Sequence, residues 1–246
     1  MEVALASYLP TYSGGLGVLA GDMLRAAADL RLPMVGVSLI HRKGYLDQDL
    51  DAAGNQTERP APWIPDAWTT ELPARVSVRL EDREIWLRAF RYDVKGAHDY
   101  TIPVLLLDTD LPENRAEDRS LTDVLYGGDA RYRLMQEAVL GIGGVRMLRA
   151  LGYGQLERFH MNEGHAALLA LELVDETARQ AGRTNIERAD IERKLREIES
   201  IIDESKEQVR TTATTVVVAI TVVAETVSLI SDSTMSAAPP GLPAPR

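Results

Sequence analysis

SGGLGVLAGD, residues 13–22, is a glycine-rich loop that runs into an apolar segment. Gly14, Gly15 and Gly17 have no Cβ, so the backbone there can turn sharply and approach a ligand closely. Residues 18–30 place apolar side chains at roughly helical spacing, which predicts a helix beginning just after the glycines. Free N–H groups and the helix dipole at such a junction suit a phosphate or another anion. A tight turn without a ligand is the alternative interpretation, because short glycine motifs are common.

Residues 1–182 have the pattern of an α/β domain, in which strands and helices alternate along the chain. Two short apolar runs, residues 32–40 and 101–111, predict buried strands. Residues 74–94 alternate apolar and polar side chains on both sides of a Glu-Asp-Arg turn, which predicts a hairpin. We expect a mostly parallel, doubly wound sheet whose ligands bind at the carboxyl ends of the strands.

A long helix is predicted within residues 120–152, after an initial loop. Gly141, Gly143 and Gly144 each lower the helix propensity of this segment by about 1 kcal/mol. Their presence indicates that a neighbouring element packs closely against this part of the helix. Residues 156–182 are expected to form the end of a strand, a turn and another helix.

The chain changes character after residue 182. Residues 183–210 predict an amphipathic helix, which packs on its own domain or pairs with a partner helix. Residues 211–230 are rich in Thr and Val and contain Glu225, so a strand or an irregular segment is favoured over a membrane span. Residues 231–246 are rich in Ser and Pro and are expected to be disordered.

The bulk composition sets limits on the function. A length of 246 residues is enough for one large domain or two small ones. The net charge of −10 argues against nucleic acid as the main partner, because phosphate-backbone binding needs a basic face. The absence of cysteine excludes disulfides and thiolate chemistry. The first residues lack the pattern of a secretory signal, so a cytoplasmic location is expected.

Four sequence blocks together indicate a family. They are YLPTYSGGLGVLAGDMLRAAADL (8–30), MVGVSLIHRKGYLDQ (34–48), LYGGDARYRLMQEAVLGIGGVRMLRALG (125–152) and FHMNEGHAALLALEL (159–173). In this order they resemble the N-terminal part of bacterial α-glucan phosphorylases, which act on glycogen, starch or maltodextrin. The resemblance extends over roughly residues 1–175 and is greatest to the shorter prokaryotic members.

The resemblance implies the Rossmann-like N-terminal domain of a two-domain GT-B glycosyltransferase fold, with the active site between the domains. Such enzymes transfer the terminal glucose of an α-1,4-glucan to inorganic phosphate and release glucose 1-phosphate. Their pyridoxal phosphate is attached to a lysine of the C-terminal domain. The positions that match the family's substrate- and phosphate-binding segments are Gly14, Gly15, Leu16, Gly17, Asn162, Glu163 and His165.

Simpler interpretations exist for several of these polar residues. His160, Glu163 and His165 resemble a metal-ligand set only weakly, because no fourth ligand lies nearby in the sequence, and we assign no metal. Apart from the resemblance, His165 is interpreted as a cap of the helix that follows. Asp129 precedes a helical pattern and is interpreted as a helix N-cap.

The sequence also departs from the family. Its lysines, Lys43, Lys95, Lys194 and Lys206, all lack the sequence context of the cofactor-bearing lysine. We therefore expect a phosphorylase fragment that is inactive alone, because the pyridoxal-phosphate domain is missing. The expected partners are α-glucan and phosphate, with the missing C-terminal domain or a homo-oligomer as protein partner. The alternatives are a non-catalytic remnant, a glucan- or phosphate-binding module, or the N-terminal domain of a nucleotide-sugar glycogen synthase. The synthase shares the Gly-Gly-Leu-Gly loop, but the LYGGD and HMNEGH blocks weigh against it.

Overall fold

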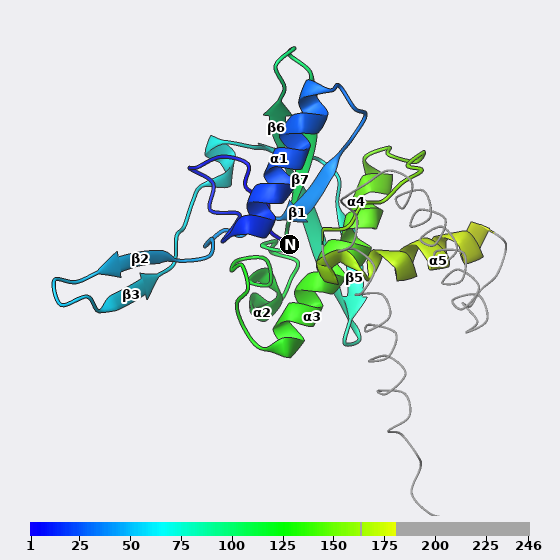
Figure 1. Ribbon diagram of the computed structural model, residues 1–246. Helices are drawn as coiled ribbons and strands as arrows, with labels where there is room; N and C mark the ends of the chain where they lie inside the picture. The colour runs from blue at the N-terminus through cyan, green and yellow to red at the C-terminus, as the bar shows by residue number, and fades with distance from the viewer. Residues whose placement is uncertain (163, 181–246) are drawn as a thin grey trace, which may run out of the picture. The chain divides into compact units, whose positions relative to one another are not determined.

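The structure is a computed structural model that describes residues 1–162 and 164–180 (Figure 1). The segments predicted at 183–210, 211–230 and 231–246 lie outside the described residues, as does Glu163. The helices are α1 (Gly15–Asp29), α2 (Ala116–Arg119), α3 (Ala130–Ala138), α4 (Gly144–Ala150) and α5 (Leu169–Gln180), with short helical turns η1 (Pro65–Ala67), η2 (Val139–Gly143) and η3 (Gly164–Ala166). The strands are β1 (Gly36–Leu39), β2 (Asp47–Leu50), β3 (Gln56–Arg59), β4 (Thr70–Glu71), β5 (Val76–Leu80), β6 (Arg83–Lys95) and β7 (Thr101–Asp108). Within the described ranges, every helix is too short or too polar to cross a lipid bilayer.

The main sheet is mixed, and mostly antiparallel. Its strand order is β1-β7-β6-β4, and β5 pairs with β6. Only β1 and β7 run parallel, whereas β6 is antiparallel to each of its partners. The α/β class is thus confirmed, but the expectation of a mostly parallel sheet was wrong. The reason is connection length: residues 96–100 join β6 to β7, and a parallel pair needs a crossover of a dozen or more residues.

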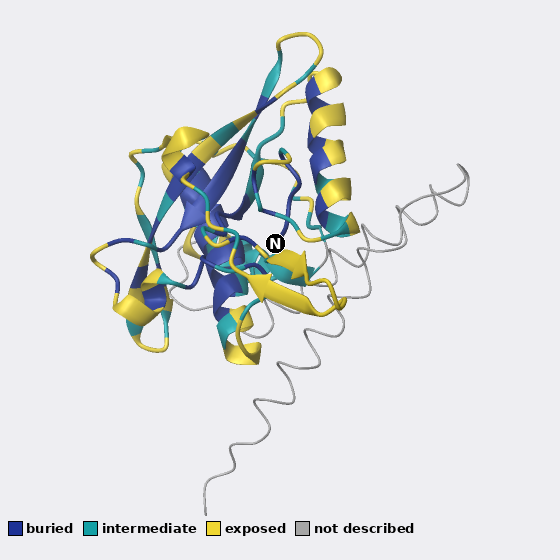
Figure 2. Ribbon diagram, turned by 90° about the vertical axis from the view of Figure 1, so that its left-hand side faces the viewer, coloured by how far each residue is buried: buried dark blue, intermediate teal, exposed yellow. Residues whose placement is uncertain are grey.

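The core lies on both faces of β7. Ile102, Val104 and Leu106 pack in one cluster with α1 residues such as Leu24. On the other face, Leu107 packs in a second cluster with side chains from residues 139–147, which span η2 and part of α4. Figure 2 shows α1 with its buried side toward the sheet and its exposed side outward. Because a strand that is covered on both faces has no polar face to solvate, the apolar run at 102–107 is what this position requires.

The helix predicted within residues 120–152 forms as α3, η2 and α4, with the π-helical turn η2 in the middle. A Cβ placed on Gly141 would lie 2.7 Å from the backbone nitrogen of Leu169, and one on Gly143 would collide with Leu87. The expected close packing is therefore confirmed at Gly141 and Gly143, whereas a Cβ on Gly144 would meet only side-chain atoms. The strand end expected near residue 156 was wrong, because residues 155–160 contain no strand and lead through η3 to α5.

Strands β2 and β3 form a separate antiparallel hairpin apart from the main sheet (Figure 1). Every residue of both strands is exposed, and Figure 2 shows this arm in the exposed colour. Arg59 forms ion pairs with Asp47 and Asp49 across the ladder. Exposed ion pairs of this kind contribute little to the stability of a fold.

The glycine packing in η2 gives a stability prediction. We expect Gly141→Ala to lower the free energy of unfolding by about 2 kcal/mol, because the new methyl group meets backbone atoms that cannot rotate away. The matched variant is Gly144→Ala, whose Cβ would meet only side-chain atoms, the nearest at 3.3 Å. Urea unfolding of both proteins measures the difference, and equal losses would contradict this account of the packing.

Candidate functional site

The glycine loop leads into α1 as the sequence predicts. Gly14 is the N-cap of α1 and makes no side-chain cap, and the first turn contains no acidic residue. The first N–H groups of a helix have no intrahelical acceptor. Within the described residues, those of Gly15, Leu16 and Gly17 have no other acceptor either. They therefore form a set of parallel donors at the positive end of the helix dipole.

The three glycines of the loop have different surroundings. A Cβ on Gly14 or Gly15 would meet no heavy atom within 4 Å among the described residues. A Cβ on Gly17 would lie 2.5 Å from Tyr12 Cβ and 2.9 Å from Glu2 Oε2. Packing within the chain therefore explains the glycine at position 17. It does not explain the other two, which leave open space beside the free N–H groups.

Glu2 belongs to the candidate site, although no sequence pattern singled it out. Its Oε2 accepts hydrogen bonds from the N–H groups of Ser13 and Gly14, at 2.6 and 3.1 Å, and from Ser13 Oγ at 3.3 Å. Its Oε1 accepts one from the Tyr126 hydroxyl at 3.0 Å. Burial alone raises the pKa of Glu2, but these hydrogen bonds outweigh it and hold the pKa below the usual 4.5. The carboxylate is therefore charged at neutral pH and fastens the start of the glycine loop.

The structure brings the two predicted site segments together. Asn162 Nδ2 donates to the backbone oxygen of Leu16 at 3.3 Å, across 146 positions of sequence. His165 Nδ1 lies 3.1 Å from Glu137 Oε1, and the ring of His165 is 5.7 Å from that of Tyr126. The candidate site thus consists of the first turn of α1, Asn162, and a side-chain cluster that joins His165 to the glycine loop through Tyr126 and Glu2.

The structure bears on two other sequence interpretations, those of Asp129 and of the His160, Glu163 and His165 set. Asp129 caps α3, because its Oδ1 accepts a hydrogen bond from the N–H of Tyr132 at 2.8 Å. Over residues 1–162 and 164–180, no group of three or more His, Cys, Asp or Glu side chains is arranged to hold a metal ion. Since Glu163 is not among them, the interpretation that included it lies partly outside the described residues.

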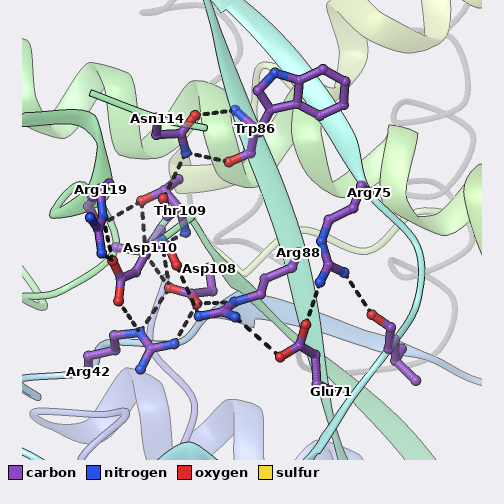
Figure 3. Close-up of polar contacts among 12 residues, drawn as sticks. Arg42, Glu71, Arg75, Trp86, Arg88, Asp108, Thr109, Asp110, Asn114 and Arg119 are labelled. Atoms are coloured by element: carbon purple, nitrogen blue, oxygen red, sulfur yellow. Dashed lines mark hydrogen bonds and ion pairs between the residues drawn. The ribbon is translucent and has the colours of Figure 1, made fainter. Parts of the chain in front are cut away.

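The carboxyl end of β7, where we expected ligands to bind, carries a network of ion pairs (Figure 3). Asp108 is fully buried and accepts two hydrogen bonds from Arg42, at 3.0 and 2.6 Å, and one from Arg88 at 2.7 Å. Arg88 continues the network to Glu71. Burial raises the pKa of Asp108, but the hydrogen bond from Arg42 and its positive charge outweigh this and lower it overall. Because the two arginines are bound to this carboxylate, the network closes the strand end and does not offer free cations to an anion.

Comparison with known proteins identifies the relatives of this chain, although no protein-family model matches it. It is 42% identical to glycogen phosphorylase of Mycobacterium tuberculosis over 74% of its own length, and 41% identical to maltodextrin phosphorylase of Thermococcus litoralis over 68%. It is 34% identical to glycogen phosphorylase of Aquifex aeolicus over 69% of its length. The chain is homologous to the N-terminal part of α-glucan phosphorylases.

This phosphorylase homologue matches only a portion of each relative. The matches span 22% of the Mycobacterium tuberculosis protein, 20% of the Thermococcus litoralis protein and 25% of the Aquifex aeolicus protein. The identity confirms the resemblance of the four sequence blocks. Because these relatives are much longer, their activity is only proposed for this phosphorylase homologue.

The buried ion pairs predict that removing the charge of Asp108 lowers the stability of the fold much more than removing the charge of Asp110. We expect Asp108→Asn to destabilise the fold by about 3 kcal/mol, because two arginines lose their buried counter-charge. Asp110→Asn removes a carboxylate that is 33% exposed and should cost less than about 1 kcal/mol. Chemical denaturation at pH 7 measures both changes, and similar effects would argue against a special role for Asp108.

The lowered pKa of Glu2 predicts a pH dependence of stability. A carboxylate whose pKa is lower in the folded than in the unfolded state stabilises the fold fully above its unfolded pKa. This contribution is lost as the pH falls below about 4.5 toward the folded pKa. We therefore expect Glu2→Gln to destabilise the protein at pH 7 and to have a progressively smaller effect below pH 4.5. Thermal unfolding across this range tests the prediction, and a pH-independent difference would contradict it.

Proposed function

We propose that this chain supplies the glycine-loop side of an α-glucan phosphorylase active site. There, the terminal glucose of an α-1,4-glucan is transferred to inorganic phosphate and leaves as glucose 1-phosphate. The contact that carries the proposal joins Asn162 to Leu16, because it brings two distant sequence blocks to the free N–H groups of α1. The α/β unit would be the N-terminal domain of a GT-B fold, consistent with the identity to phosphorylases.

The free N–H groups of Gly15, Leu16 and Gly17 have the chemistry that this transfer needs. Cleavage of a glycosidic bond in the presence of phosphate concentrates negative oxygens around a carbon that develops positive charge. Fixed amide donors stabilise the oxygens without reorganising, and the dipole of α1 adds to their effect. The open space at Gly14 and Gly15 lets a sugar or phosphate oxygen reach these donors. Asn162 and His165 are proposed to hold the surrounding loops in position, and Glu163 is proposed to assist them.

Pyridoxal phosphate would supply the group that exchanges a proton with the substrate phosphate. The described lysines do not fit its attachment site. Lys43 is exposed and forms an ion pair with Asp123 at 2.7 Å, and Lys95 is exposed at the end of β6. We therefore assign no cofactor-dependent step to the described residues and propose that a partner domain carries the cofactor. α-Glucan and phosphate are the proposed ligands, and a C-terminal domain is the proposed partner. A second copy of this chain is the alternative partner for association, but it would bring the same lysines and not the cofactor site.

The activity of the chain tests this assignment. Purified chain with maltodextrin, phosphate and pyridoxal phosphate should release no glucose 1-phosphate, because the groups that transfer protons are proposed to lie elsewhere. Co-expression with a phosphorylase C-terminal domain should restore release. Glucose 1-phosphate formed by the chain alone would overturn the need for a partner. Ligand binding without activity in either preparation would indicate a binding module instead.

The open glycines allow a sharper test that separates binding from folding. We expect Gly15→Ala to leave the free energy of unfolding within about 0.5 kcal/mol of wild type, since nothing lies near the new methyl group. The same methyl group occupies the space beside the free N–H groups, so phosphate binding should weaken at least tenfold. Titration with phosphate, followed by NMR of backbone amides, measures the affinity. Unchanged affinity in a folded Gly15→Ala protein would show that ligands do not use this space.

A further inference from the structure

Glu2 joins two loops that are far apart in the sequence. One carboxylate oxygen binds the backbone N–H groups of Ser13 and Gly14, and the other accepts from the hydroxyl of Tyr126. Ser13 and Gly14 directly precede α1, and Tyr126 belongs to the LYGGD block. Glu2, which is 6% exposed, thus fixes the start of α1 relative to Tyr126, a residue 124 positions after Glu2 itself.

The surrounding backbone is built to accept this carboxylate. Gly17 leaves room for it, because a Cβ there would lie 2.9 Å from Glu2 Oε2. Tyr126 has a φ of 59°, in the left-handed region that a residue with a bulky side chain rarely adopts. Such a conformation persists only where the surrounding structure imposes it, and it is often found at functional sites. Here it accompanies the hydrogen bond from the Tyr126 hydroxyl to Glu2.

We propose that Glu2 is a positioning residue of the active site, which sets the direction of the free N–H groups of Gly15, Leu16 and Gly17. This inference rests on the proposed function, because it assumes that those groups bind substrate oxygens. Glu2 accepts hydrogen bonds from the N–H groups of Ser13 and Gly14, which precede this set. A ligand is therefore left with the N–H groups in the first turn of α1. Through Tyr126 it also fixes the side of the site where His165 pairs with Glu137.

If Glu2 had a different role, removing its charge would change the phosphate affinity in the opposite direction. If the carboxylate only competed with phosphate as a second anion, removing its charge would strengthen phosphate binding. If it holds the donors in place, removing its charge weakens binding, because a neutral amide cannot accept all the hydrogen bonds that the carboxylate accepts. The effect of Glu2→Gln on phosphate affinity therefore distinguishes positioning from competition.

The experiment titrates the full chain with inorganic phosphate and follows the amide resonances of Gly15, Leu16 and Gly17. We expect Glu2→Gln to shift these resonances in the free protein and to weaken phosphate binding at least tenfold. Tyr126→Phe removes a single hydroxyl and should weaken binding by a smaller factor, which keeps the test decisive if Glu2→Gln fails to fold. Glu176→Gln removes the carboxylate that pairs with Arg149 and should leave phosphate affinity unchanged.

The outcomes separate this inference from the proposed function. If wild-type resonances do not shift saturably with phosphate, the proposed binding site is wrong and the role of Glu2 fails with it. If wild type binds but folded Glu2→Gln binds equally well or more tightly, the positioning role alone is overturned. Unchanged binding in Tyr126→Phe would likewise count against it. Amide resonances of β6 and β7 serve as the control for folding.

Discussion

Burial of β7 on both faces is the constraint on which the rest of the structure depends. Ile102, Val104 and Leu106 belong to the cluster under α1, and Leu107 belongs to the cluster under residues 139–147, so each helical layer is needed to cover the strand. The strand ends in Asp108, and a carboxylate that is fully buried needs cationic partners. Arg42 follows β1 and Arg88 lies on β6, so the ion pairs join the same three strands as the backbone ladder.

Local patterns predicted the longer strands and helices, but they missed the β2–β3 hairpin and predicted strand direction poorly. The apolar run that becomes β7, the hairpin of β5 and β6, and the loop before α1 were all evident from residue spacing. Alternation of strands and helices favoured a parallel sheet, but the five residues between β6 and β7 decide the direction of that pair. The glycines of η2 were informative because a residue unfavourable in a helix needs a compensating contact, and Leu169 and Leu87 provide it.

The candidate site was predictable only where it carries a recognisable pattern. The glycine loop and the segment with Asn162 and His165 were selected, and the structure places them in contact. Glu2 was not selected, because its role depends on Tyr126 and on backbone N–H groups that no local pattern connects to it. Asp108 was not selected either, because its role depends on Arg42 and Arg88, which lie elsewhere in the sequence. Contacts between residues that are distant in sequence arise only in the folded chain, so local residue spacing does not predict them.

The contact between Asn162 and Leu16 has a consequence for the order of events during synthesis. β5, β6 and β7 follow one another closely, so this meander forms from local contacts, which are the quickest to close. The parallel pairing of β1 with β7 must wait for the whole meander, and the polar contact at α1 must wait until residue 162 has left the ribosome. β7 therefore leaves the ribosome before Asn162 does, and the glycine loop remains without Asn162 until translation has passed that residue.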